Sequence, residues 1–189
     1  MKSAIHAFKF FLALDDPDTQ VTEQELRCLL DHVNGAKVVV EIGCYEGKTT
    51  AALARQTKGK VYSVDPFFKG RMNICYGELI AKAHCRRQGA NNVEFLKGFS
   101  HEVAPTFSEP IDFLFIDADH TYDAIKRDWN DWAQKVRPGG HIALHDSRIA
   151  PNSPSYLGSM QFYEQDVSRM VGVEEVAAVD SLALLRVRQ

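Results

Sequence analysis

The stretch VVVEIGCYEGKT, Val38–Thr49, decides the fold of this chain. Its three valines and Ile42 predict a buried strand, and the alanine-rich segment Thr49–Arg55 predicts a helix directly after it. Gly43 and Gly47 lie in the turn between them, where a ligand can approach a backbone that carries no side chain. The spacing E-x-G-x-x-x-G differs from the G-x-G-x-x-G of dinucleotide-binding proteins, which favours a nucleoside without a phosphate.

Length and composition indicate a globular protein of one domain. The chain has 189 residues, with 45% hydrophobic and 25% charged residues and a formal net charge of -3. This charge argues against a nucleic-acid partner. We expect no membrane association, because no segment reaches the about 18 apolar residues that a spanning helix needs.

The four cysteines predict neither a zinc site nor a redox pair. No two of them have the spacing C-x-x-C; they are Cys28, Cys44, Cys75 and Cys85. Free thiols are typical of a reducing compartment, so we expect a cytoplasmic protein.

Residues 1–34 are expected to form a helical extension packed on a domain of residues 35–189. The first helix would bury Phe8, Phe11 and Leu12, together with Ile5. A second helix is predicted to begin after Thr22, because Glu25 three residues later completes a capping box. An exposed aromatic face on the first helix would favour a homodimer.

Strands and helices alternate through the rest of the chain. The predicted strands are Lys37–Ile42, Lys60–Val64, Val93–Leu96, Ile111–Ile116, His141–Leu144, Val173–Val179 and Ser181–Val187. The predicted helices are Gly47–Gln56, Gly77–Gln88, Ser100–Phe107, Tyr122–Lys135 and Ser159–Met170. This order predicts an α/β fold whose parallel sheet has helices on both faces, and the last two strands are close enough that they must pair antiparallel.

Polar residues and glycines gather where the predicted strands end. They include Glu41, Gly43, Cys44, Tyr45, Gly47, Asp65, Phe99, Ser100, Asp117, Asp119, His120, His145 and Asp146. Ligands of open α/β sheets bind at this edge, so the sequence predicts its site there.

Asp65 is predicted to accept hydrogen bonds from the two hydroxyls of a ribose. It follows the second strand, 22 residues after Gly43. In nucleotide-binding folds, an acidic residue at this place binds the ribose hydroxyls. Phe99 and Ser100 could contact an adenine. The alternative is that Asp65 is a turn residue before Pro66.

Asp117, Asp119 and His120 lie within four residues of one another, and clustered carboxylates need a compensating cation. A divalent ion would provide it, with His145 and Asp146 of the adjacent strand completing the ligands. Magnesium prefers oxygen, so a histidine ligand would favour manganese, iron or zinc. The alternative is that Asp119 caps a helix and His145 is structural.

His120 is the predicted general base. The ordinary pKa of a histidine, about 6.5, lies near working pH, and neighbouring carboxylates would increase its basicity. It could take a proton from a substrate hydroxyl.

Four segments resemble the class I S-adenosylmethionine-dependent methyltransferases. They are EIGCYEGKTTAALA, VYSVDP, FIDADHTYDAIKRDWNDW and RPGGHIALHD, and the resemblance extends from Ala36 to Val187. Within that class they resemble the O-methyltransferase group of the macrocin and other sugar O-methyltransferases and the cephalosporin-hydroxylase-like proteins.

The resemblance implies a Rossmann-like seven-stranded sheet of order 3-2-1-4-5-7-6 with strand 7 antiparallel. It implies that Glu41–Gly47 contacts the methionine end of S-adenosylmethionine and Asp65 its ribose. In the metal-dependent relatives, the positions matching Asp117, His145 and Asp146 bind the ion, although histidine in the middle position is a departure. We also expect Asp117 to contact the cofactor. The position matching His120 is a general base in the sugar methyltransferases.

These expectations combine into one hypothesis: methyl transfer from S-adenosylmethionine to an oxygen of a small hydroxylated acceptor, assisted by a divalent metal such as magnesium or manganese. The loops Phe67–Tyr76 and Pro151–Gly158 would select the acceptor. Two alternatives are a protein that binds S-adenosylmethionine without methyl transfer and a nicotinamide-dependent oxidoreductase. The missing third glycine argues against the oxidoreductase.

Overall fold

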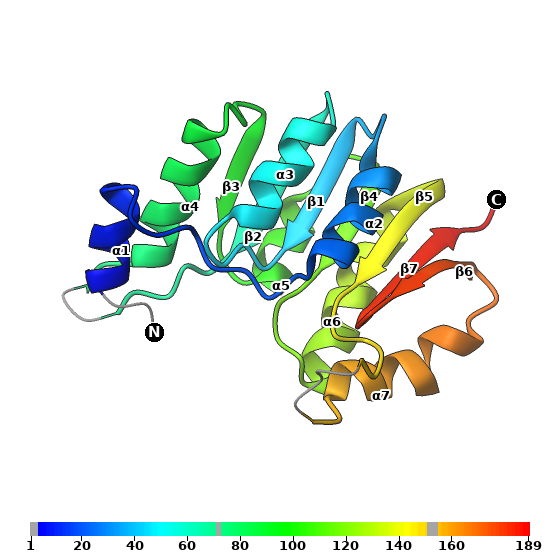
Figure 1. The fold of residues 1–189 in the computed structure, drawn as a ribbon. Coiled ribbons are helices and arrows are strands. Elements are labelled where there is room, and N and C mark those ends of the chain that lie inside the picture. Colours follow the sequence, from blue (N-terminus) through cyan, green and yellow to red (C-terminus); the bar gives the residue numbers. More distant parts are fainter. Residues whose placement is uncertain (1–3, 71–72, 151–154) are drawn as a thin grey trace.

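The computed structural model describes residues 4–70, 73–150 and 155–189 (Figure 1). One seven-stranded sheet runs through the molecule in the order β3-β2-β1-β4-β5-β7-β6. Neighbouring strands from β3 to β5 pair parallel, whereas β7 pairs antiparallel with both β5 and β6. The predicted fold class and strand order are therefore confirmed.

The strands agree closely with the predicted ranges. They are β1 Val38–Ile42, β2 Lys60–Asp65, β3 Val93–Lys97, β4 Ile111–Ile116, β5 Val136–Leu144, β6 Val173–Val179 and β7 Leu182–Val187. The largest difference is at β5, which begins five residues before the predicted His141. The predicted turn Pro138–Gly140 is part of this strand, which pairs with β4 through an irregular register between Ile111 and Phe113.

The helices cover both faces of the sheet (Figure 1). The α-helices are α1 Ala4–Phe11, α2 Glu23–Val33, α3 Lys48–Gln56, α4 Tyr76–Arg87, α5 Ser100–Val103, α6 Tyr122–Trp132 and α7 Gly158–Gln165. Three predicted helices end as short 3-10 turns: η2 Ala104–Thr106, η3 Ala133–Lys135 and η4 Val167–Arg169. In the described part of the chain, no helix is long and apolar enough to cross a membrane.

Two hydrophobic clusters lie on opposite faces of the sheet. Strand β4 shows the division, because Phe113 and Phe115 face the cluster beneath α2, α3 and α4, while Leu114 and Ile116 face the cluster beneath α6 and α7. Successive side chains of a strand point to opposite faces, so a strand buried on both sides reads as a continuous apolar run.

Helix α1 packs through a different face from the predicted one. Its buried residues are Ala7 and Phe10, which pack against Ile80 of α4. The side chains predicted to be buried are exposed: Ile5, Phe8, Phe11 and Leu12. The prediction was wrong because α1 docks on a single helix at the edge of the molecule (Figure 1), where a narrow contact covers only part of its apolar surface.

Helix α2 begins as predicted. The Thr22 hydroxyl accepts a hydrogen bond from the Glu25 backbone, and the Glu25 carboxylate accepts one from the backbone N–H of Thr22. In the two predicted acceptor loops, residues 71–72 and 151–154 lie outside the described residues.

Candidate functional site

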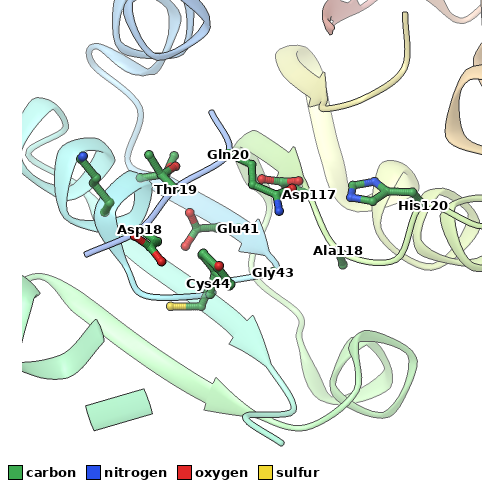
Figure 2. A pocket seen from close by; sticks show the side chains of 12 residues that line it. Asp18, Thr19, Gln20, Glu41, Gly43, Cys44, Asp117, Ala118 and His120 are labelled. Atoms are coloured by element: carbon green, nitrogen blue, oxygen red, sulfur yellow. The ribbon is translucent and has the colours of Figure 1, made fainter. Parts of the chain in front are cut away.

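Two adjoining cavities lie at the carboxyl ends of the parallel strands. The smaller has a volume of about 200 Å³ and is lined by Glu41, His120 and the segment Asp18–Gln20 before α2 (Figure 2). The larger has a volume of about 1180 Å³. Four residues line both cavities: Gly43, Tyr45, Asp117 and Ala118. The site therefore lies at the predicted edge of the sheet.

The two glycines of the turn after β1 have different roles. A Cβ on Gly43, which has φ +95°, would lie 1.9 Å from the backbone oxygen of Asp117. Gly47 has φ +76° and lines neither cavity; a Cβ there would lie 2.9 Å from Ala81 of α4. Gly43 thus permits contact between the ends of β1 and β4, whereas Gly47 permits close packing of α3 on α4.

Asp65 fixes the glycine turn. Its Oδ2 accepts hydrogen bonds from the backbone N–H groups of Cys44 (2.9 Å) and Tyr45 (3.2 Å), and its Oδ1 accepts one from Phe67 (2.7 Å). A carboxylate has about four acceptor positions, so one is left for a ligand hydroxyl. Asp65 lines the larger cavity, where it has room to accept from one ribose hydroxyl and not from the two that were predicted.

Cys44 and Tyr45 face different surroundings. The Cys44 side chain is buried, its sulfur lies 3.5 Å from the Thr50 hydroxyl, and burial raises the pKa of its thiol well above the ordinary value. A buried thiol with a raised pKa is poorly suited to act as a nucleophile. Tyr45 has φ +54°, is 45% exposed and lines both cavities.

Glu41 is a buried residue that lines the smaller cavity. Its Oε2 accepts hydrogen bonds from the hydroxyls of Thr50 and Ser63, while Oε1 has no hydrogen-bond partner among the described residues. Burial raises the pKa of Glu41 to about 8, against the lowering effect of these two hydrogen bonds. A cationic group of a ligand in the smaller cavity would satisfy Oε1 and stabilise the charged form.

The larger cavity has an aromatic wall. Phe67, Phe68 and Phe99 line it, and the rings of Phe68 and Phe99 meet edge to face with centroids 5.6 Å apart. Such a wall suits a flat aromatic ligand. The predicted adenine contact Phe99 therefore lies in the cavity, 44% exposed.

Ser100 also lines the larger cavity, where its hydroxyl donates a hydrogen bond to Asp128. Burial raises the pKa of Asp128 to about 6. The sequence reasoning missed Asp128, although a signal was present: it lies at helical spacing from Ile125 and Trp132, so an acid occupies the buried stripe of α6.

His145 lies behind the cavities, between two acids. Its Nδ1 is 3.0 Å from Asp117 Oδ1 and its Nε2 is 3.2 Å from Glu25 Oε2, and the residue is 2% exposed. Burial alone would lower the pKa of His145, but the hydrogen bonds with Asp117 and Glu25 outweigh it and raise this pKa to about 10. A carboxylate thus faces each ring nitrogen of His145, an arrangement that suits an imidazolium donating from both.

His120, the predicted general base, lines the smaller cavity with 30% of its side chain exposed. Its Nε2 lies 3.5 Å from Asp146 Oδ2, which is also 3.6 Å from His145 Nδ1. Asp119, in contrast, accepts a hydrogen bond from the backbone N–H of Thr121 just before α6, which agrees with the helix-capping alternative.

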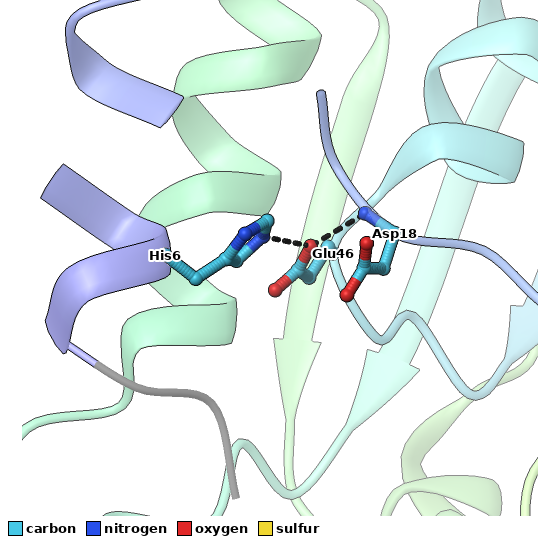
Figure 3. A group of neighbouring side chains, drawn as sticks. All are labelled: His6, Asp18 and Glu46. Carbon is cyan, nitrogen blue, oxygen red and sulfur yellow. Dashed lines mark hydrogen bonds and ion pairs between the residues drawn. The ribbon is translucent and has the colours of Figure 1, made fainter. Parts of the chain in front are cut away.

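The predicted metal ligands Asp117, His145 and Asp146 do not fit a divalent ion. A metal needs a lone pair on a ring nitrogen, and both nitrogens of His145 are engaged by carboxylates. Among the described residues, only His6, Asp18 and Glu46 bring three ligand atoms of this kind within 4.8 Å of one another (Figure 3).

This second group ties the N-terminal segment to the glycine turn. Glu46 Oε2 lies 3.0 Å from His6 Nε2 and accepts a hydrogen bond from the backbone N–H of Asp18 (Figure 3). On the other side of the ring, His6 Nδ1 lies 3.0 Å from Asp15 Oδ2. The hydrogen bond with Glu46 raises the pKa of His6. Both nitrogens of His6 are thus also engaged by carboxylates, and the group connects α1, residues 15–18 and the turn after β1.

The chain resembles a longer protein over part of that protein's length. The chain is 27% identical over 134 residues to the uncharacterized protein R132 of Acanthamoeba polyphaga mimivirus; the match spans 68% of this chain and 59% of that protein.

Solved structures share the fold over almost the whole chain. A cofactor-bound structure of Rv0187 from MTB superposes with a TM-score of 0.74 at 22% identity, covering 97% of this chain and 88% of that one. The O-methyltransferase TomG from Streptomyces achromogenes, involved in tomaymycin synthesis and solved in complex with SAM, superposes with a TM-score of 0.69 at 21% identity, covering 100% and 92%.

The family is shown by the sequence itself. The family model described as "Methyltransferase domain" matches residues 40–147, which are more than half of the chain and extend from within β1 to just after β5. The chain belongs to this methyltransferase domain family and has the fold of the S-adenosylmethionine-dependent methyltransferases.

Proposed function

We propose that this protein transfers a methyl group from S-adenosylmethionine to an oxygen of a small hydroxylated acceptor. The observation that carries the proposal is Glu41: a buried carboxylate with an unsatisfied oxygen faces a small polar cavity that opens into a large aromatic one. That combination suits a ligand with a cationic amino-acid end and a flat nucleoside.

The two cavities match the parts of this cofactor. The amino-acid end would lie in the smaller cavity with its ammonium group against Glu41, and the nucleoside would lie against Phe99 with its ribose at Asp65. The larger cavity, about 1180 Å³, exceeds the roughly 300–1000 Å³ of ordinary ligand pockets, which leaves room for an acceptor beside the cofactor.

When bound, S-adenosylmethionine supplies an electrophilic methyl group on a sulfonium. Gly43, Tyr45 and Asp117 line the junction of the cavities and would orient the reacting groups there. Alignment of this kind is worth up to roughly 7–11 kcal/mol. His120 would take the proton of the acceptor hydroxyl, and Asp146 beside its Nε2 would stabilise the imidazolium that forms.

The remaining features of the proposal concern the domain, its location and its partners. We take residues 1–34 as a helical extension of a methyltransferase domain of residues 35–189, acting in the cytoplasm on a small molecule and not on nucleic acid or a membrane. The exposed side chains Ile5, Phe8 and Leu12 of the N-terminal segment favour a homodimer.

The test is a transfer assay. The protein is incubated with S-adenosylmethionine and a panel of phenols, catechols, hydroxy acids and sugars, and products are identified by mass spectrometry. An acceptor that gains one methyl group on oxygen supports the proposal. Binding of S-adenosylhomocysteine without transfer to any acceptor would favour a binding protein, and binding of NAD in its place would favour an oxidoreductase.

A further inference from the structure

We propose that Glu25 is a positioning residue of this site, and that the Glu25–His145 pair supplies the positive charge between its carboxylates so that no divalent ion is required. The part that concerns His120 rests on the proposed function, in which His120 is the base. The pair itself is a property of the fold that can be tested without any acceptor.

Glu25 is fixed from four directions. Its Oε1 accepts hydrogen bonds from the backbone N–H (2.9 Å) and the hydroxyl (2.7 Å) of Ser181 in the β6–β7 turn. Its Oε2 accepts one from the backbone N–H of Thr22 (2.8 Å) and one from His145 Nε2. These four bonds use the acceptor capacity of a carboxylate, so Glu25 is held in one position from which it orients the ring of His145.

His145 brings opposite charge to a group of acids. Asp117 and Asp146 both lie near its Nδ1, at 3.0 and 3.6 Å, and Glu25 lies at its other nitrogen. Three carboxylates at these distances would repel one another without a cation. An imidazolium that donates to Asp117 and Glu25 meets that need with a side chain of the protein.

Asp146 connects His145 to His120. It follows His145 directly and has φ +49°, and its backbone oxygen accepts a hydrogen bond from the Ser159 hydroxyl (2.6 Å). Its Oδ2 lies between the rings of His145 and His120. A change at Glu25 is therefore expected to reach His120 through His145 and Asp146, although Glu25 lines neither cavity.

The test is nuclear magnetic resonance of the full chain labelled with ¹⁵N-histidine, with His145→Gln and His120→Gln used to assign the signals. In the wild-type protein, His145 should show protons on both ring nitrogens that exchange slowly with water. Addition of Mn²⁺, which broadens the signals of its ligands, should leave them unchanged. Selective broadening of the His145 signals by Mn²⁺ would overturn the proposal, and the signals that decide it are those of the wild-type protein.

Glu25→Gln provides the second arm, with Glu23→Gln on the exposed face of the same helix as the matched control. Glu25→Gln should speed exchange of the Nε2 proton of His145 about tenfold or more, as expected for a weakened charged hydrogen bond, and should shift the ring signals of His120. Glu23→Gln should change neither. Unchanged His145 and His120 signals in a folded Glu25→Gln protein would overturn the proposal. Titration of the same samples with S-adenosylhomocysteine tests the proposed function separately.

Discussion

Gly43 and Asp117 are in backbone contact at the point where the two cavities meet. The space that a Cβ on Gly43 would need is filled by the carbonyl group of Asp117, at 1.9 Å from its oxygen. The ends of β1 and β4 therefore come together closely enough to place Glu41 and Asp117 on one cavity. Any larger residue at position 43 must separate these strand ends.

Gly43→Ala should lower both stability and cofactor affinity. The backbone clash adds to the strain of φ +95°, so we expect a loss of about 2–4 kcal/mol in the free energy of unfolding and at least a tenfold weaker affinity for S-adenosylhomocysteine. Gly35→Ala is the control, because Gly35 has φ +82° and no heavy atom within 4 Å of a Cβ. It should cost about 1 kcal/mol and leave the affinity unchanged. Equal effects of the two substitutions, measured by denaturant unfolding and calorimetry, would contradict the role given to the contact.

Asp65→Asn should weaken binding of S-adenosylhomocysteine about tenfold or more. The amide has one acceptor oxygen in place of two, so it cannot hold the N–H groups of Cys44, Tyr45 and Phe67 and also accept from a ribose. Asp112→Asn is a matched control, because Asp112 accepts hydrogen bonds from the backbone of Lys37 and Val38 at the start of β1.

Both substitutions should lower the midpoint of thermal unfolding, whereas only Asp65→Asn should change the affinity. An unchanged dissociation constant for S-adenosylhomocysteine in a folded Asp65→Asn protein would contradict the ribose contact at Asp65.

Glu41→Gln should change how stability depends on pH. Folding raises the pKa of Glu41 from 4.5 to about 8, so between these values the folded protein holds a proton that the unfolded chain releases. The stabilisation from this group is therefore complete below about pH 4.5 and falls by up to about 1.4 kcal/mol per pH unit as pH rises toward 8. Glutamine does not titrate. As the pH rises through this range, the free energy of unfolding of Glu41→Gln should therefore increase relative to that of the wild-type protein. If the free energies of unfolding of the two proteins changed in parallel with pH, Glu41 could not be a buried carboxyl with a raised pKa.

His120→Gln should separate catalysis from binding. Loss of the base should lower the rate of methyl transfer by about 10²–10⁴, while affinity for S-adenosylhomocysteine should remain within about twofold, because the ring is not among the predicted cofactor contacts. His32→Gln, on α2 and outside both cavities, should change neither quantity. A variant at position 120 that retains full turnover would show that another group accepts the proton.

Much of the fold follows from local pattern in the sequence. The apolar run Ile111–Ile116 and the capping box at Thr22 and Glu25 were predictable because strand burial and helix capping depend on neighbouring residues. The buried face of α1 was not predictable, because it depends on the helix against which α1 packs. Sequence spacing placed His145 near Asp117 but had no means of placing Glu25, which is 120 residues from His145, against the same ring. That contact supports the charged bridge proposed for His145 in place of a metal ligand.

The central claim is that the cavities at the strand ends bind S-adenosylmethionine, and calorimetric titration with S-adenosylhomocysteine tests it most directly. We predict micromolar binding with one site per chain, with the same dissociation constant in magnesium and in EDTA. Absence of binding in both buffers would contradict the claim.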